Sequence, residues 1–337
     1  MPVRRYGVSS RDDSFQSFSN GFVTWPGGAT KHSIMNSRAN ETENHVRLLD
    51  GGTGSELRRR GIALSEVCWS AAANLGHVEL VTAIHRDYLG AGSDIITANT
   101  FATSRFVLAA AGLAEQFGTI NANAILAAKC AAADANRNVI VAASLSCMPP
   151  GFDSNAYPSP DIEYRAYCEL TECFAAHGVD LVLLEMLQDD AHTARACRAV
   201  RAQGLPFWAG ISCRRAAGVD ANHRVRLVSF DNPELPFEPV LDTVLRFEPA
   251  GIAIMHSPLD ALAPALATVG QRWSGPIGAY PEIPYAEDPA AVDVHPVSPE
   301  SFVAAARDSL ALDVTLIGGC CGTTAAHIAA LRALLDD

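Results

Sequence analysis

The sequence predicts a closed (β/α)8 TIM barrel, in which eight parallel strands alternate with helices. Eight short apolar runs recur along residues 46–337, and segments of helical pattern stand between them. Runs that are apolar at nearly every position are typical of strands in a parallel sheet that helices cover on both faces. Eight such units in a stretch of this length match the barrel, which typically needs about 250 residues plus insertions.

A doubly wound open sheet is the alternative fold that this alternation allows. Such a sheet usually carries a glycine-rich phosphate-binding turn after its first strand. Here the first run ends in Asp50-Gly51-Gly52-Thr53-Gly54, which begins with a carboxylate and has a different glycine spacing. The sequence therefore favours the closed barrel.

The first half of the barrel is predicted to contain four strands and three clear helices. The helices are expected over residues 55–61, 78–89 and 120–136, and the last of these is rich in alanine. The strands are expected at residues 46–49, 93–100, 138–145 and 179–186.

The second half of the barrel ends in a cysteine-containing turn. Its strands are expected at residues 205–213, 250–257, 275–281 and 314–317. After the last strand come Gly318-Gly319-Cys320-Cys321-Gly322 and then a helical pattern over residues 325–331. Thr324 precedes this helix and is its predicted N-cap, since a threonine hydroxyl can accept a hydrogen bond from the first turn.

Residues 1–45 differ from the rest of the chain. They are polar, rich in serine, asparagine and arginine, and show no sustained hydrophobic period. We expect an N-terminal extension, flexible or laid over the main domain, followed by a barrel domain over residues 46–337.

The composition limits which binding partners and which cellular location we expect for the protein. The net charge of -12 disfavours binding to nucleic acid or to an anionic membrane surface. No apolar run approaches the length of a membrane span, and residues 1–6 lack the apolar core of a signal peptide. Nine cysteines without a framework spacing indicate reduced thiols, so we expect a cytoplasmic protein. Barrels of this type often associate, and a homo-oligomer is compatible with the sequence.

Polar side chains stand at the predicted carboxyl ends of the strands. Active sites of these barrels lie at that end, so the side chains should meet in one mouth. The set combines carboxylates, amide and hydroxyl groups, an aromatic residue and soft metal ligands: Asp50, Asn99, Thr100, Ser144, Glu185, Cys213, His256, Tyr280, Cys320 and Cys321.

The adjacent thiols of Cys320 and Cys321 are the most specific feature of this set. Neighbouring cysteines form a disulfide only with strained geometry, whereas two thiolates on a glycine-flanked turn suit a soft metal such as Zn²⁺. The alternative is a pair of small buried residues in a tight turn, because cysteine often packs as a small hydrophobe.

Several motifs together resemble the homocysteine S-methyltransferase family, which includes betaine–homocysteine and S-methylmethionine–homocysteine methyltransferases. They follow in family order and cover residues from about 47 to 337. The matching stretches are residues 49–52, 96–101, 184–185, 280–281 and 318–323, with His327-Ile328.

The resemblance implies a zinc-dependent S-methyltransferase with a role in methionine biosynthesis. It would move a methyl group from a sulfonium or quaternary ammonium donor to the thiolate of homocysteine or a related thiol. The family holds zinc with three cysteines, of which Cys320 and Cys321 match two. The third closes the sixth strand, where this chain has His256-Ser257. We predict His256 as the third ligand; the alternatives are Cys213 and the absence of a tight zinc site.

The resemblance also implies that Asp50 and Glu185 bind the amino group of the thiol substrate. Two acids at a barrel mouth suit an ammonium group on chemical grounds as well. The alternatives are that Asp50 caps the first helix and that Glu185 forms a rim ion pair. Asn99 and Thr100 would hydrogen-bond the substrate or tie loops together.

The cationic donor is expected against aromatic faces, through cation–π attraction. The candidates are Trp69, Trp208, Tyr280 and Tyr285, and the alternative for each is a packing residue of the barrel core or rim. After Tyr280-Pro281, relatives often have asparagine, whereas this chain has Glu282.

Two other functions stay open. A zinc hydrolase or lyase on the same barrel would use a metal-bound hydroxide, with Glu185 as base. A non-catalytic barrel would only bind a small molecule. Sulfonium and betaine donors present the same charge and methyl group, so the sequence leaves the donor open.

Overall fold

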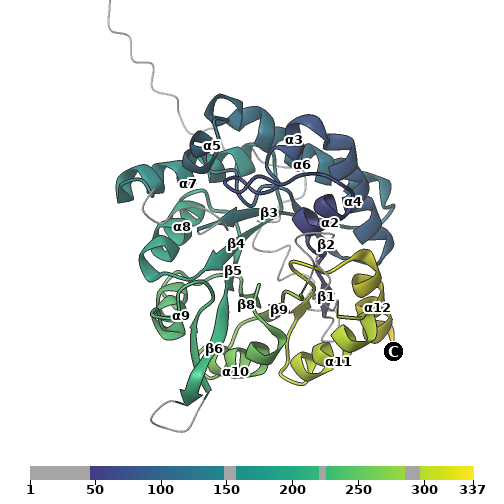
Figure 1. Cartoon of the computed structure of the whole chain (residues 1–337), viewed down its shortest axis with the longest axis vertical. Helices are drawn as coiled ribbons and strands as arrows, with labels where there is room; N and C mark the ends of the chain where they lie inside the picture. The colour runs from purple at the N-terminus through teal and green to yellow at the C-terminus, as the bar shows by residue number, and fades with distance from the viewer. Residues whose placement is uncertain (1–45, 148–156, 220–224, 285–296) are drawn as a thin grey trace, which may run out of the picture. The chain divides into compact units, whose positions relative to one another are not determined.

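The computed structural model describes residues 46–147, 157–219, 225–284 and 297–337, so the predicted extension and Tyr285 lie outside the described residues. Within these ranges, eight parallel strands pair in the order β1-β10-β9-β8-β5-β4-β3-β2. A parallel bridge between Leu49 and Ile95 joins the two ends of this order. The sheet therefore closes, and the predicted barrel is confirmed (Figure 1).

The barrel strands are short and follow the predicted apolar runs. Their bounds are β1 (Arg47–Leu48), β2 (Ile95–Ala98), β3 (Ile140–Ser146), β4 (Leu181–Leu187), β5 (Phe207–Ile211), β8 (Gly251–Met255), β9 (Ile277–Tyr280) and β10 (Leu316–Ile317).

Helices surround the strands as an outer ring (Figure 1). None in the described ranges is long and apolar enough to cross a membrane. Their bounds are α2 (Thr53–Arg59), α3 (Ala73–Gly76), α4 (Val78–Gly90), α5 (Arg105–Ala110), the 3₁₀ helix η1 (Ala114–Gln116), α6 (Phe117–Asp134), α7 (Pro160–Ala176), α8 (Asp190–Ala202), α9 (Phe237–Leu245), α10 (Leu259–Gly270), α11 (Pro299–Leu310) and α12 (Ala325–Asp336).

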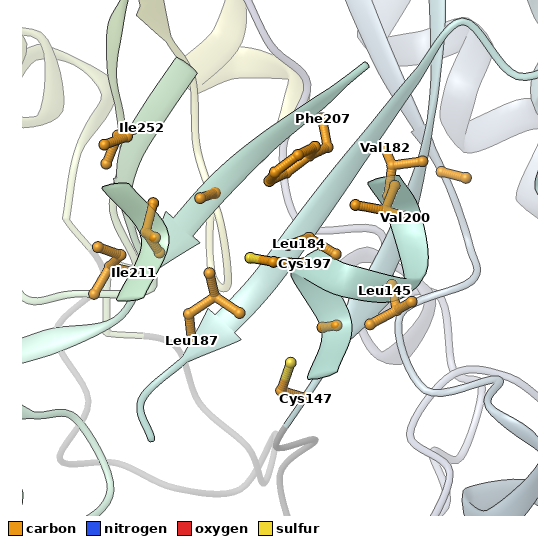
Figure 2. Close-up of a cluster of buried hydrophobic side chains, with 14 of the residues drawn as sticks. Leu145, Cys147, Val182, Leu184, Leu187, Cys197, Val200, Phe207, Ile211 and Ile252 are labelled. Carbon is orange, nitrogen blue, oxygen red and sulfur yellow. The ribbon is translucent and has the colours of Figure 1, made fainter. Parts of the chain in front are cut away.

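The two-residue period of a strand divides each barrel strand between two cores. In β4, Leu181 and Leu183 pack inside the barrel, whereas Val182 and Leu184 pack outward against the helices. Figure 2 shows part of the outer core, where Val182 is drawn beside Val200 of α8 and Leu184 beside Cys197 of the same helix. Burying each such aliphatic side chain stabilises the fold by about 1.5–3 kcal/mol.

The same period aims site residues into the mouth. The inward series of β4 continues from Leu181 and Leu183 to Glu185. A register shift against β5 follows between Leu184 and Leu187, and Met186 there has φ +53°. Bulges of this kind re-aim side chains next to functional sites. Both Glu185 and Met186 consequently face the cavity at the barrel mouth.

The fifth predicted strand differs from the structure. The run over residues 205–213 ends as a barrel strand at Ile211, and Cys213 opens an antiparallel hairpin instead of closing the strand. The hairpin consists of β6 (Cys213–Val219) and β7 (Val225–Ser229). An apolar run cannot show where a chain leaves one sheet and enters another, because both environments bury it.

Thr324 is confirmed as the N-cap of α12. Its hydroxyl accepts a hydrogen bond from the Ala326 N–H at 3.2 Å, and the His327 Nδ1 accepts one from the Thr324 N–H at 3.2 Å. This capping box fixes the start of the helix directly after the cysteine turn.

Candidate functional site

A pocket opens at the carboxyl ends of the barrel strands. It collects residues from the ends of most strands and from the loops that follow β1 and β10. Its polar, aromatic and sulfur-containing lining includes Asp50, Trp69, Ser70, Asn99, Phe101, Ser144, Glu185, Met186, Met255, His256, Tyr280, Cys320 and Cys321.

The turn that carries the cysteines is fixed by its backbone. The Cys320 N–H donates to the Pro281 carbonyl at 2.9 Å, and the Thr323 hydroxyl donates to the Cys320 carbonyl at 2.7 Å. Gly322 has φ +82°, and a Cβ there would lie 2.3 Å from the Ile283 carbonyl oxygen. The position therefore requires glycine on two grounds, its left-handed backbone and its close contact.

His256, Cys320 and Cys321 form a cluster of candidate metal ligands. Their ligand atoms all lie within 4.8 Å of one another, and His256 Nδ1 is 3.5 Å from Cys320 Sγ. Zinc–sulfur bonds of about 2.3 Å place tetrahedral ligand atoms about 3.8 Å apart, so a small closure would fit the ion. Two thiols with an imidazole form a donor set that suits Zn²⁺.

The His256 ring stands in negative surroundings. Burial lowers its pKa, but the Cys321 thiol, Glu282 and Asp231 outweigh this effect and raise the pKa to about 9. Surroundings that favour an imidazolium ion also favour a metal cation.

Cys213 is not part of this cluster. It is fully buried, its N–H donates to the Ser257 hydroxyl at 2.9 Å, and the same hydroxyl lies 3.8 Å from its sulfur. Burial raises the pKa of Cys213 to about 12. In the described residues, the geometry brings together His256, Cys320 and Cys321 and leaves the alternative ligand outside.

Asp50 points into the pocket and does not cap the first helix. Gly52 is the N-cap residue of α2, whereas the Asp50 carboxylate accepts hydrogen bonds from the Thr97 N–H at 2.7 Å and the Thr97 hydroxyl at 2.9 Å. Burial raises the pKa of Asp50 to about 7, although the Thr97 hydrogen bonds lower it.

Glu185 is the second carboxyl group of the pocket. It is 9% exposed and accepts a hydrogen bond from the Ser144 hydroxyl. Burial raises its pKa to about 7, and the nearby charge of Asp50 adds to the rise. Among the described residues it has no basic partner, so it is not a rim ion pair.

Asn99 and Thr100 are both engaged by the protein. Asn99 lines the pocket, but its amide donates to Asn74 and to the Ser70 carbonyl and accepts from the Ser70 hydroxyl. Thr100 is buried outside the lining and ties β2 to Ser144 of β3, donating at 2.8 Å and accepting at 2.9 Å. These contacts favour supporting roles for both residues.

The aromatic candidates separate into two groups. Tyr280 and Trp69 line the pocket. Trp208 is buried in the barrel interior, where a Cβ on Gly251 would lie 2.4 Å from its ring, so it is a packing residue. The Tyr280 hydroxyl is buried near Glu185, whose charge raises the tyrosine pKa further after burial itself.

The structure adds two methionines that the sequence did not single out. Met186 and Met255 line the pocket, and the Ser212 hydroxyl donates to the Met255 sulfur at 2.9 Å. The inward series of β8, which also contains Ala253, could have identified Met255. Met186 faces inward only because of the register shift in β4, which no sequence period shows.

Comparison with known proteins agrees with these features. The family model described as homocysteine S-methyltransferase matches residues 47–335. Homocysteine S-methyltransferase YbgG of Bacillus subtilis is 26% identical over 310 residues, covering 85% of this chain and 93% of that protein. Betaine–homocysteine S-methyltransferase 1 of Bos taurus is 27% identical over 330 residues, covering 90% and 75%. Selenocysteine Se-methyltransferase of Brassica oleracea is 23% identical over 320 residues, covering 85% and 87%.

Solved structures show the same fold. The metallated form of the homocysteine methyltransferase MmuM from Escherichia coli superposes with a TM-score of 0.68 at 22% identity, covering 89% of this chain and 99% of that one. The apo form gives a TM-score of 0.63 at 22% identity, covering 88% and 97%. With its barrel, its cysteine turn and a family match over residues 47–335, the chain belongs to the homocysteine S-methyltransferase family.

Proposed function

We propose that this enzyme is a zinc-dependent methyltransferase that acts on homocysteine or a related amino-acid thiol. The methyl group would come from a sulfonium or quaternary ammonium donor. One observation carries the proposal: a single pocket holds both the His256, Cys320 and Cys321 cluster and the two buried carboxyl groups of Asp50 and Glu185.

His256, Cys320 and Cys321 would hold the zinc ion as its three protein ligands. Bound there, zinc would supply the positive charge that lowers the pKa of the substrate thiol, which is ordinarily about 8.5. The thiol would then react as a thiolate without a separate base.

Asp50 and Glu185 would bind the ammonium group of the acceptor. Thr97 and Ser144 orient the two carboxylates by hydrogen bonds. Both carboxyls are buried and carry raised pKa values, so a bound ammonium would provide the positive charge that their surroundings lack. The amino group of the substrate would thereby set the position of its sulfur.

Methyl transfer would then need only alignment of the two substrates. The thiolate sulfur attacks the methyl carbon in line, a new S–C bond forms, and the C–S or C–N bond of the donor breaks. The electron pair of the broken bond returns to the donor heteroatom, which becomes neutral. Because the reaction removes one negative and one positive charge, a buried pocket favours it. The pocket-lining rings of Tyr280 and Trp69 are suited to a cationic donor.

Zinc content and methyl transfer, measured together, test this proposal. Wild type and Cys320→Ser are compared with homocysteine and a panel of S-methylmethionine, S-adenosylmethionine and betaine. We expect near one zinc per chain and thiol consumption with at least one donor in wild type, both lost in Cys320→Ser. Cys213→Ser is the matched control, since this buried thiol lies outside the cluster and its variant should keep its zinc.

The same experiment separates the other functions. A hydrolase or lyase would turn over substrate with no thiol present, and a binding protein would bind ligand without turnover. Zinc in wild type without consumption of any thiol would contradict the methyltransferase proposal, and loss of zinc in Cys213→Ser would contradict the ligand assignment.

A further inference from the structure

We propose that Glu282 is a positioning residue for His256: its carboxylate holds the imidazole so that Nδ1 faces the two cysteines. This inference rests on the proposed zinc site. Nothing in the family match assigns a role to this carboxylate, which lies beside the ring and outside the ligand cluster itself.

The two nitrogens of the His256 ring face different partners. Nδ1 lies 3.5 Å from Cys320 Sγ, and Nε2 lies 3.3 Å from Glu282 Oε2. A carboxylate at Nε2 keeps the proton on that nitrogen and leaves the lone pair of Nδ1 free for a metal. Metal-binding histidines usually donate their other N–H to such an acceptor, which fixes both tautomer and ring orientation.

The backbone places Glu282 with respect to the cysteine turn. The carbonyl of Pro281 accepts from the Cys320 N–H at 2.9 Å, and the N–H of Ile283 donates to the Cys321 carbonyl at 3.0 Å. Glu282 therefore stands between two hydrogen bonds that join its segment to both cysteines. These hydrogen bonds fix the position of Glu282 relative to Cys320 and Cys321.

The remaining contacts of His256 restrict the ring further. The ring forms an edge-to-face pair with Phe230, with ring centroids 4.6 Å apart. Its own backbone has φ +42°, an uncommon conformation for a residue other than glycine. Such strain persists only where the surroundings hold the residue in place, and it concentrates at functional sites. With Phe230 on one side and Glu282 at Nε2, the ring can present only Nδ1 to the cluster.

Glu282 would also change the net charge of the proposed zinc site. Two thiolates and a neutral imidazole cancel the charge of Zn²⁺, whereas three thiolates would leave one negative charge. A carboxylate on the far nitrogen of the imidazole restores that negative charge without occupying a ligand position. An imidazole ligand paired with a carboxylate is thus closer in charge to a third thiolate than an imidazole alone.

Asp231 is a second acidic residue near His256, and its side chain binds another partner. Its side chain accepts from the Gln188 amide at 2.7 Å, and its N–H donates to the Gln188 side-chain carbonyl at 2.6 Å. Its charge raises the pKa of His256, but the ion pair that the ring forms among the described residues is with Glu282. Asp231→Asn therefore removes a nearby charge but leaves the orienting contact intact, and it is the matched control for Glu282→Gln.

The test is the zinc dissociation constant of the purified protein, measured by competition with a chromophoric chelator. Glu282→Gln should weaken zinc binding by about 10–100-fold, as loss of such supporting groups typically does. Asp231→Asn should change it much less. Equal zinc affinity in Glu282→Gln and wild type, or an equal loss in both variants, would overturn the inference.

A second pair of variants separates positioning from a general effect on folding. In a His256→Cys background there is no imidazole to orient, so Glu282→Gln should leave zinc affinity unchanged or strengthen it. The same loss in both backgrounds would also overturn the inference. Failure of wild type itself to bind zinc would refute the proposed function together with this inference, whereas zinc binding that ignores Glu282 refutes this inference alone.

Discussion

At the scale of single residues, burial disfavours the ionised form of Asp50 and Glu185. The proposed binding of an ammonium group nevertheless requires both carboxyl groups to be ionised. Both side chains are buried in the pocket, and burial raises the pKa of each to about 7. The folded protein thus holds these carboxylates at a cost in stability, and an ammonium group of the substrate would offset that cost. The ionised carboxylates are therefore expected to lower the stability of the folded protein and to strengthen binding of the substrate.

Asp50→Asn tests this opposition. The folded pKa of Asp50 is raised above the unfolded value of 3.8, so its contribution to stability is present below about pH 4 and is lost as the pH rises through about 7. The amide keeps partners for both Thr97 groups and carries no charge. We expect the free energy of unfolding without substrate to rise by up to about 4 kcal/mol at pH 8, which corresponds to the rise of the pKa from 3.8 to about 7, and to match wild type near pH 4.

The same variant should bind the thiol acceptor more weakly. A charged hydrogen bond contributes about 1.5–3 kcal/mol, so KM for homocysteine should rise about tenfold or more. In wild type, KM should fall as the pH rises through about 7, because the carboxylates bind ammonium only when ionised. Urea denaturation at the two pH values and initial-rate kinetics measure both effects. An unchanged KM would contradict the assignment of Asp50 to the amino group.

Residue types at strand ends were enough to predict much of the polar lining of this pocket. Asp50, Glu185, Tyr280 and the cysteines follow apolar runs, and strand ends of a parallel barrel share one mouth. The roles of Asn99 and Thr100 could not be predicted this way, because their partners Ser70 and Ser144 come from other units of the barrel. A strand-end position alone does not show which polar groups the protein itself already engages.

At the scale of elements, the turn between β10 and α12 is where local and long-range constraints meet. The capping box of Thr324 fixes the helix after it, and Gly52 approaches the Cys320 carbonyl so closely that a Cβ there would lie 2.7 Å from that oxygen. The loop after β9 contacts its other side through Ile283. The position of both thiols depends on three segments that are far apart in the sequence.

Gly322→Ala tests how strongly the turn sets the metal site. Its φ of +82° and the 2.3 Å approach of a Cβ to the Ile283 carbonyl would both oppose alanine. Gly61→Ala is the control, since Gly61 has φ +86° but no atom within 4 Å of its Cβ position. The control should lose about 1 kcal/mol of stability through backbone strain alone.

We expect Gly322→Ala to lose more stability than the control and to bind zinc more weakly, because the turn must shift away from Ile283. Thermal denaturation and chelator competition provide the two readings. Equal zinc affinity in Gly322→Ala and Gly61→Ala would show that the turn tolerates the displacement and that its geometry does not control the metal site.

At the scale of the whole molecule, the sequence was sufficient to predict the number of strands and the closure of the barrel. It was not sufficient to predict the hairpin outside the barrel or the contacts between loops. Eight apolar runs fixed the number of units, and the bridge between Leu49 and Ile95 completes the ring that their number predicted. The hairpin of β6 and β7 was hidden because only its first residue, Cys213, falls in the apolar run of β5, and Arg214 and Arg215 follow without an apolar pattern. The contact between Glu282 and His256 was hidden for a related reason, since it joins the loops after two neighbouring barrel strands.

The strand order of the barrel explains why His256, Glu282 and the cysteine turn lie close together. Strands β8, β9 and β10 are neighbours in the sheet, so His256, Glu282 and the cysteine turn follow three adjacent strands. Parallel strands of a barrel end at one face, which brings their following residues together without any local sequence motif. The candidate zinc site is thus a property of strand order as much as of residue type.

X-ray absorption at the zinc edge tests the central claim most directly. It counts the sulfur neighbours of zinc in the loaded protein, without and with homocysteine. We predict two sulfur atoms and an imidazole nitrogen from the protein, and three sulfur atoms once homocysteine is added. A sulfur count that stays at two in saturating homocysteine would contradict the claim that the metal activates the thiol of the substrate.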